Sequence, residues 1–413
     1  MTARLLAGPA LDAGPEPLAS HVARLGPLPG PAERQGIAPL LESAGLLGRG
    51  GAGFPVGRKW SSVASRSGGR AVVLANGAEG EPLSAKDRVL MSTRPHLVLD
   101  GAELAAAAVG ADQIVIYVGS EHRAARAAIE RAMDERMADM RRIATRVPTE
   151  LVAAPPTYIA GEESAAVHFV NDGDARPVTT PPRPFERGID GRPTLVQNVE
   201  SLAHAALIAR HGDEWYRGMG RAETPGTALI TIGGAPRPGV AEIEIGTTLA
   251  DVAQIAGAPA SLGPVLLGGY FGGWVAGPSA WQTPLDPQEL RRAGSAFGCG
   301  VVRFLRDDEC GVRATALILD FMAGQSAAQC GPCVFGLRAI ADATARLAQG
   351  TARDDDLRRV GGWSQTLAGR GACRHPDGAV GLLRSALRTF DDDFNSHQRG
   401  RGCVAGRRAW AAA

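Results

Sequence analysis

The chain has little net charge, no long hydrophobic run and no cysteine before Cys299. Among 413 residues, 44 Lys and Arg nearly balance 43 Asp and Glu, which leaves a net charge of +1. That balance provides no basic footprint for nucleic acid and no acidic tail. No apolar run approaches membrane-spanning length, and the first residues lack the apolar core of a signal peptide. We therefore expect a soluble, cytoplasmic protein without nucleic-acid partners or direct membrane insertion.

The six cysteines all fall in the last third of the chain, at Cys299, Cys310, Cys330, Cys333, Cys373 and Cys403. A disulfide-stapled fold would spread its cysteines and is usually small and secreted. Clustering in a cytosolic chain indicates metal or redox chemistry instead.

The Cys330-Gly331-Pro332-Cys333 run, together with Cys373 and Cys403, offers thiolates for a metal centre. Four thiolates suit a tetrahedral zinc or an iron–sulfur cluster. The rival interpretation is a thioredoxin-type redox pair, which has the same tetrapeptide but needs a preceding strand. Residues 312–323 have a helical pattern instead. Cys299 and Cys310 are expected to be small buried apolar groups.

A glycine-rich run covers residues 48–55, Gly-Arg-Gly-Gly-Ala-Gly-Phe-Pro. Glycines let the backbone approach a ligand closely, and successive exposed N–H groups suit a phosphate. Arg49, Arg58 and Lys59 can neutralise its charge. The run matches G-x-G-x-x-G, but that motif should follow a strand, and residues 37–47 have helical spacing. The sequence thus indicates a nucleotide-phosphate loop in an unusual setting; the alternative is a plain glycine turn.

Strand and helix patterns alternate after this run. We expect strands at 71–75, 113–117 and 150–153, separated by helices at 96–109 and 121–142. Such alternation is typical of a mainly parallel sheet with helices packed on it.

A small α+β unit is expected after a polar linker at 221–226. Its strands are expected at 227–232, 241–245 and 265–267, with a short helix at 248–256. Beyond Pro287 the chain is largely helical, with strong helical patterns at 312–323, 335–348 and 380–394.

Two acidic runs are candidates for a site. Residues 76–82, Asn-Gly-Ala-Glu-Gly-Glu-Pro, follow the first strand, where parallel sheets usually place ligands. Glu162 and Glu163 lie at an expected helix start, in the run 158–165. Glutamate is also what a helix amino terminus prefers, so that pair has a purely structural interpretation as well.

Taken in order, these runs resemble the NuoF family, the flavin subunit of NADH:quinone oxidoreductase (complex I), which includes flavin subunits of related NAD-linked hydrogenases and formate dehydrogenases. The resemblance covers nearly the whole chain after residue 36. Besides the glycine run, the matching positions are Gly57, Lys59-Trp60, Lys86-Asp87-Arg88, Pro95-His96, Gly161-Glu162-Glu163, Pro193-Thr194 and Asn198-Val199-Glu200.

The resemblance implies a fold with several parts. An N-terminal arm (1–36) would precede an FMN-binding α/β domain (37–220) with a mainly parallel sheet. A β-grasp (SLBB) domain at 226–283 and a helical iron–sulfur bundle at 287–403 would follow. Residues 1–36 are rich in Pro, Gly and Ala, so we expect the arm to pack loosely.

The resemblance also implies the site. NADH would pass a hydride to FMN, and single electrons would pass to a [4Fe–4S] cluster. Glu81 and Glu163 would border the hydride-transfer face. The cofactor-binding residues would be Gly48, Arg49, Gly50, Gly51, Ala52, Gly53, Lys59, Asn76, Glu79, Tyr158, Gly161, Glu162, Gln197 and Asn198.

The chain departs from the family pattern at several positions, so it is a divergent member. Ala327 stands at the first position of the family's cluster motif, and Cys330, Cys333 and Cys373 match the other three. Cys403 is the substitute ligand that we expect. Ala78 replaces an Asp, and Gln197 the first of two paired Asn. Ser62 and Arg183 replace aromatic residues that stack on the adenine of NADH, and Thr180 a Lys.

The sequence thus predicts a flavoprotein oxidoreductase. NADH would be its donor, with NADPH as another option. The acceptor would be a redox protein, such as a ferredoxin or a thioredoxin-like iron–sulfur subunit. An alternative is a degenerate scaffold that serves as an interaction or assembly subunit without turnover. A third is a zinc-stapled binding module without flavin.

Overall fold

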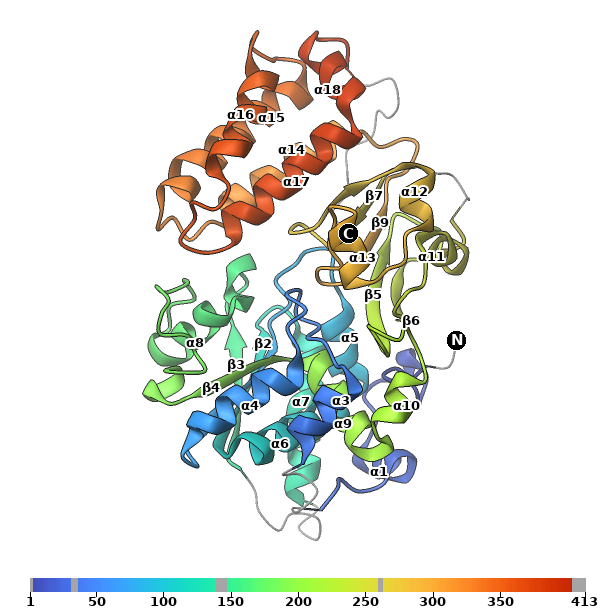
Figure 1. Cartoon of the computed structure of the whole chain (residues 1–413), viewed down its shortest axis with the longest axis vertical. Coiled ribbons are helices and arrows are strands. Elements are labelled where there is room, and N and C mark those ends of the chain that lie inside the picture. The colour runs from blue at the N-terminus through green and yellow to red at the C-terminus, as the bar shows by residue number, and fades with distance from the viewer. Residues whose placement is uncertain (1–2, 31–35, 139–146, 259–262, 403–413) are drawn as a thin grey trace. The chain divides into compact units, whose positions relative to one another are not determined.

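The structure is a computed structural model that describes residues 3–30, 36–138, 147–258 and 263–402. The chain divides into two compact units. The first comprises residues 1–80, 85–229 and 240–246, and the second comprises 81–84, 230–239 and 247–413. Figure 1 shows the elements of both.

The first unit is built on a parallel sheet. Its strands are β1 (Ala71–Gly77), β2 (Ala111–Gly119), β3 (Thr149–Ala154) and β4 (Thr194–Asn198), in the order β3-β2-β1-β4. The helices are α1 (Leu18–Leu25), α3 (Ile37–Ala44), α4 (Val56–Ser67), α5 (Lys86–Thr93), α6 (Pro95–Val109), α7 (Arg123–Ala138), α8 (Glu163–Asp172), α9 (Val199–His211) and α10 (Asp213–Arg217), with 3₁₀ turns at Leu11–Ala13, Tyr158–Gly161 and Ile189–Gly191.

Alternating strand residues fill both faces of this sheet. Val73 and Ala75 of β1 join the large core beneath α3, α4, α6, α7 and α9. Val72 and Leu74 point to the opposite face, where they pack with residues of α8. Because both faces are covered, β1 is a continuous apolar run, as buried parallel strands are. The predicted parallel α/β domain is confirmed.

The N-terminal arm is packed, so the expectation of loose packing is wrong for its described residues. Leu5 is fully buried, and the Arg94 guanidinium donates to the carbonyls of Leu6, Ala7 and Pro9. His21 on α1 hydrogen-bonds to Asp100 on α6 at 2.7 Å. Proline and glycine remove periodicity, but they do not prevent a segment from docking through its carbonyls.

The second unit begins with a mixed sheet. Its strands are β5 (Thr227–Gly233), β6 (Gly239–Glu244), β7 (Val265–Leu267), β8 (Gly273–Val275) and β9 (Val301–Phe304), in the order β6-β5-β9-β7-β8. The boundary between the units passes through β5 and leaves residues 240–246 in the first. Short helices α11 (Leu249–Ala256), α12 (Gly277–Gln282) and α13 (Pro287–Arg292) accompany the sheet.

The sheet extends past residue 283, where we expected this domain to end. Strand β9 lies between β5 and β7, parallel to β5 and antiparallel to β7. Its neighbours in sequence are glycine-rich, so no strand pattern marks it in the amino-acid sequence.

A helical bundle completes the second unit. It consists of α14 (Gly311–Gly324), a π-helical segment (Pro332–Leu337), α15 (Arg338–Gln349), α16 (Asp356–Leu367), α17 (His375–Thr389) and α18 (Asp391–Gln398). Helix α14 packs on α15 and α17, and α16 packs on the same two helices. The predicted helical C-terminal region is confirmed.

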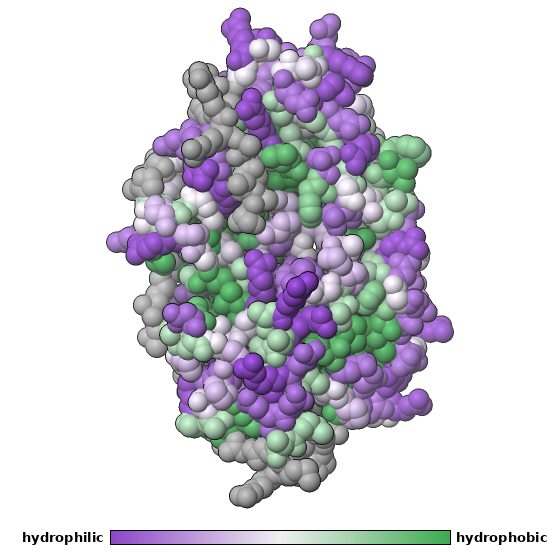
Figure 2. Space-filling model, turned by 180° about the vertical axis from the view of Figure 1, so that it is seen from behind, coloured by the Kyte–Doolittle hydropathy of each residue, from purple (hydrophilic) through white to green (hydrophobic). Residues whose placement is uncertain are grey.

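None of the described helices combines the length and apolarity needed to cross a membrane. Hydrophilic residues are interspersed with smaller hydrophobic patches over the face displayed in Figure 2.

Candidate functional site

The polar candidates gather at the carboxyl ends of β1 and β4. Strands β2 and β3 lie on one side of β1 and β4 lies on the other, so the strand order reverses between β1 and β4. Parallel α/β sheets bind ligands at such a switch point. Asn76 ends β1, and Gln197 and Asn198 end β4, with Asn76 and Asn198 directly paired in register.

The glycine run forms a closed loop in front of α4. Leu47 and Pro55 form an antiparallel bridge, and the N–H of Gly48 donates to the Phe54 carbonyl at 2.9 Å. Helix α3 precedes the loop, as the sequence predicted, so this is not a strand–loop–helix unit. Gly51 has a φ of 102°, a conformation that side chains disfavour.

The tip of this loop presents free donors. Gly50, Gly51 and Ala52 are exposed. Within the described residues, the backbone N–H groups from Gly50 to Gly53 make no hydrogen bond. A run of unused N–H groups beside glycines is a concavity suited to an anion.

The Arg49 side chain points into the protein. It is 5% exposed, and its guanidinium donates to the Tyr216 hydroxyl at 3.2 Å and the Thr227 carbonyl at 2.8 Å. Its backbone N–H donates to Ser201 Oγ at 2.8 Å. The cation that we expected beside a phosphate therefore anchors the base of the loop instead.

Lys59 is the cation that remains near the surface. Its Nζ lies 3.2 Å from Oε1 of Glu163, and the side chain is 23% exposed. Arg58 is paired with Glu42 on the surface. The Lys59–Glu163 pair joins the helix after the glycine loop to the start of α8.

Asn76 ties the end of β1 to the segment that precedes α8. Its Nδ2 donates to the Gly161 carbonyl at 2.9 Å, and its Oδ1 accepts from the Ala78 N–H. A Cβ on Gly80 would lie 2.9 Å from the Tyr158 carbonyl oxygen, so the two segments run close together. The β1 loop and residues 158–161 thus form one wall of the site.

Two of the predicted cofactor-binding glutamates cap helices. Glu79, at a φ of 45°, accepts from the N–H groups of Asp87 and Arg88 at the start of α5. Glu162 accepts from the N–H groups of Ser164 and Ala165 at the start of α8. Their carboxylates shape the loops and stabilise the positive ends of both helices.

Residues at the end of β4 are also engaged within the protein. Gln197 Oε1 accepts from the indole N–H of Trp60 at 3.3 Å. Asn198 caps α9 through Oδ1, which accepts from the N–H groups of Glu200 and Ser201.

Glu81, the first of the predicted catalytic residues, belongs to the second unit. It is 8% exposed, and its two oxygens accept backbone N–H groups from Leu83 and Tyr270. Gly269 allows this approach, because a Cβ there would lie 2.7 Å from Glu81 Oε2.

Three candidate metal ligands gather at the start of the π-helical segment and before α17. Burial acts to raise the pKa of Cys330, but N–H groups of Ala372 and Cys333 lower it overall. Burial raises the pKa of Cys333 to about 11, and the nearby Cys330 and Cys373 add to this. Among the described residues, no three His, Cys, Asp or Glu side chains form a single-ion site. Cys403 lies outside the described residues.

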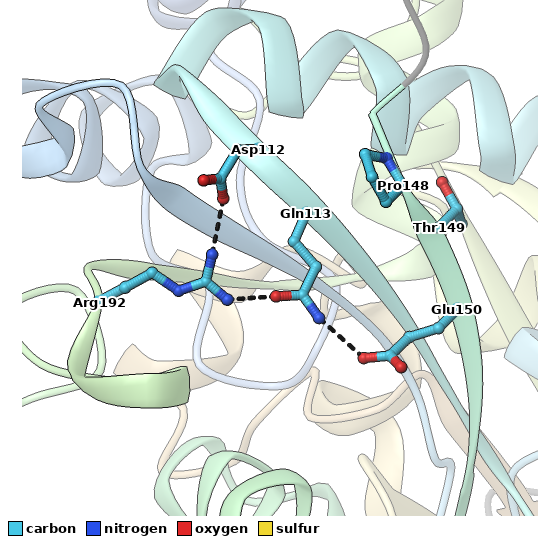
Figure 3. Close-up of a pocket in the computed structure, with 6 residues that line it drawn as sticks. All are labelled: Asp112, Gln113, Pro148, Thr149, Glu150 and Arg192. Carbon is cyan, nitrogen blue, oxygen red and sulfur yellow. Dashed lines mark hydrogen bonds and ion pairs between the residues drawn. The ribbon is translucent and has the colours of Figure 1, made fainter.

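A hollow of about 320 Å³ lies at the amino ends of the strands and is a poor candidate. Figure 3 shows that Arg192 bridges Asp112 and Gln113, while Gln113 reaches Glu150. These side chains satisfy one another, so the hollow offers no converging free groups.

Comparisons with known proteins agree with the position of the site. Residues 41–206 match the model of the Nuo51 FMN-binding domain, and residues 313–397 match that of the NADH-ubiquinone oxidoreductase-F iron-sulfur binding region. NADH-quinone oxidoreductase F subunit 2 of Rhizobium meliloti (strain 1021) is 31% identical over 378 residues, which cover 89% of this chain and 90% of that protein. The chain belongs to the NuoF family of NADH-quinone oxidoreductase components.

Other members of this group are linked to hydrogenases. NADP-reducing hydrogenase subunit HndC of Solidesulfovibrio fructosivorans is 27% identical, over 89% of this chain and 77% of its own length. The crystal structure of an air-oxidized NAD+-reducing [NiFe]-hydrogenase has a TM-score of 0.82 and 27% identity, covering all of this chain and 68% of that one.

The residues present in this NuoF-family chain fit the phosphate of FMN. The glycine loop supplies the unused N–H groups, and Lys59 supplies a cation close by. For a [4Fe–4S] cluster, Cys330, Cys333 and Cys373 supply three thiols of suitable chemistry.

Sequence reasoning missed several residues that build the site. Ser201, Asp87 and Glu200 hold the loops from beneath, although two of the family-matching runs contain Asp87 and Glu200. Phe54 was also missed: its ring is 54% exposed at the end of the glycine loop. An apolar residue directly after a glycine run was the available signal.

Proposed function

We propose that this chain is the flavoprotein subunit of a larger oxidoreductase. It takes electrons from NADH on FMN and passes them through a [4Fe–4S] cluster to a protein acceptor. The observation that carries this proposal is the exposed glycine loop, with unused N–H groups, beside the carboxyl ends of β1 and β4.

The residues of the first unit bind and orient the cofactor. The N–H groups from Gly50 to Gly53 would hold the phosphate, and Lys59 would add its charge. Gly48, Asn76, Tyr158, Gly161 and Gln197 would form the walls through backbone and amide groups. FMN supplies the two-electron to one-electron exchange, and the cluster carries one electron at a time.

The carboxylates border the face on which the nicotinamide would lie. Glu163 is partly exposed and would face the donor, while its pairing with Lys59 limits the negative charge there. Glu81, held by two N–H groups, would supply a fixed charge. These roles concern the local field, because the cofactor itself performs the chemistry.

The cluster would be held by Cys330, Cys333, Cys373 and Cys403. The five-stranded sheet would be the β-grasp (SLBB) domain of the family. The acceptor would be a ferredoxin or a thioredoxin-like iron–sulfur subunit, since a one-electron carrier matches a cluster that releases single electrons.

An anaerobic preparation tests the proposal directly. The protein is reconstituted with FMN, iron and sulfide, and flavin and cluster absorbance are followed after rapid mixing with NADH or NADPH. We expect one FMN, a brown cluster and flavin reduction by a nicotinamide. A protein that stays free of flavin would refute the proposal. Bound flavin that neither nucleotide reduces would support the assembly scaffold instead.

A further inference from the structure

A chain of buried charges lies beneath the glycine loop. Lys86 Nζ is 2.7 Å from Asp87 Oδ1 and 2.8 Å from Glu200 Oε2. Glu200 Oε1 lies 3.9 Å from Nε of Arg49 and accepts the N–H of Leu229 at 2.9 Å. Lys86 and Glu200 are 2% and 0% exposed.

This chain reaches the loop by two routes. Asp87 Oδ2 accepts the Asn198 amide at 2.7 Å, and a Cβ on Gly50 would lie 3.3 Å from Asn198 Cβ. On the other side, Arg49 belongs to the loop itself, and its N–H is bound by Ser201. The loop therefore rests on Asn198 and Arg49, and both are held by the buried charges.

The charges balance within the cluster, which contains two cations and two carboxylates. Burial acts to lower the pKa of Lys86, but Asp87 and Glu200 outweigh it and raise that pKa, so the ammonium stays charged. Removing one partner of a buried ion pair leaves an uncompensated charge, whereas removing both is far better tolerated.

We propose that Lys86, Asp87 and Glu200 are positioning residues for the flavin. Through Asn198 and Arg49 they hold the glycine loop and the amino end of α9 in the arrangement that receives the phosphate. This inference rests on the proposed function. It assigns a role to two family-matching runs, Lys86-Asp87-Arg88 and Asn198-Val199-Glu200, for which none was expected from the sequence.

A charge-balanced double variant tests the proposal on the full chain. Lys86→Met should weaken FMN binding at least about tenfold and shift the flavin midpoint potential, since two carboxylates lose their partner. Lys86→Met combined with Glu200→Gln should recover most of that affinity, as coupled sites are not additive. Binding is measured by quenching of FMN fluorescence, and the potential by an anaerobic redox titration.

The control is Arg136→Met, which breaks a buried pair with Asp100 and Glu103 on α6. It should lower thermal stability without changing FMN affinity or potential. If Lys86→Met fails to fold, Asp87→Ala, which removes only the acceptor of the Asn198 amide, takes its place. Wild-type affinity and potential in these site variants, or equal losses in Arg136→Met, would overturn the inference. Failure of the wild-type protein to bind FMN would instead overturn the proposed function.

Discussion

The ammonium of Lys59, one turn into α4, lies 3.2 Å from the carboxylate of Glu163 at the start of α8. Both side chains are partly exposed, so the pair contributes little to stability and can be broken by a competing anion. The geometry makes Glu163 a regulator of how much of the Lys59 charge reaches a phosphate.

Lys59→Met is expected to weaken FMN binding about tenfold, because a charge-assisted hydrogen bond contributes roughly 1.5–3 kcal/mol. Glu163→Gln should strengthen binding slightly, since it releases the ammonium. Fluorescence titration at two salt concentrations measures both effects. Opposite shifts support the competition, whereas weaker binding in both variants contradicts it.

Gly51→Val should expel the flavin without unfolding the protein. Gly51 has a φ of 102° in the exposed loop, where a branched side chain strains the backbone that must approach the phosphate. The matched control is Gly173→Val, at a φ of 75° after α8 with nothing within 4 Å. Bound flavin is read from absorbance after gel filtration, and retention of flavin in Gly51→Val would show that the loop does not hold it.

Phe54→Ala should weaken binding of the nicotinamide donor. The ring is 54% exposed beside the loop, and base–aromatic stacking contributes about 1–3 kcal/mol. Because about 1.4 kcal/mol is tenfold, the concentration of NADH that half-saturates flavin reduction should rise about five- to 150-fold. Phe335→Ala, which removes a ring that is 76% exposed in the helical bundle, should leave it unchanged. Equal behaviour of the two variants would exclude stacking on Phe54.

Cys403→Ser should alter the EPR spectrum or the retention of the cluster, because Ala327 leaves one family ligand missing. Cys299→Ser is the control. Its sulfur donates to the Gly268 carbonyl at 3.3 Å, and a serine hydroxyl can do the same. An unchanged cluster in Cys403→Ser rejects that residue as a ligand and leaves Cys330, Cys333 and Cys373 in place.

Acid should destabilise the docked N-terminal arm. Burial acts to raise the pKa of Glu16, but hydrogen bonds from Arg24 and His21 outweigh it and lower the pKa to about 2. The unfolded value is 4.5. The resulting stability, on the order of 2–3 kcal/mol, is present above pH 4.5 and lost as the pH falls toward 2. Denaturant unfolding of wild type and Glu16→Gln checks this. Their difference should shrink with acid, and a difference independent of pH would contradict it.

The regular elements of the first unit could be predicted because burial leaves a local trace. Val72, Val73 and Leu74 form an apolar run, and β1 follows from it. Strand β4 left a weaker trace, because it is only five residues long and ends in Gln197 and Asn198. The helix expected over 380–394 is broken at Phe390, whose ring packs against Trp274 at 5.1 Å, a contact made far along the chain.

The site divides in the same way. The glycine loop could be found because its backbone demands leave a residue signature. The destinations of side chains could not, since Arg49, Glu79 and Glu162 have partners chosen by the tertiary fold. A charged residue in a family motif thus has the same appearance in sequence whether it touches a ligand or supports the loop that does.

The insertion of β9 between β5 and β7 also constrains how the chain is made. Synthesis proceeds from the amino terminus, so β5 emerges from the ribosome long before Val301–Phe304 can occupy its free edge. An unpaired edge invites pairing with other chains, and partly made sheets are prone to aggregate. Co-translational chaperoning should therefore matter most in the interval between the appearance of these two strands.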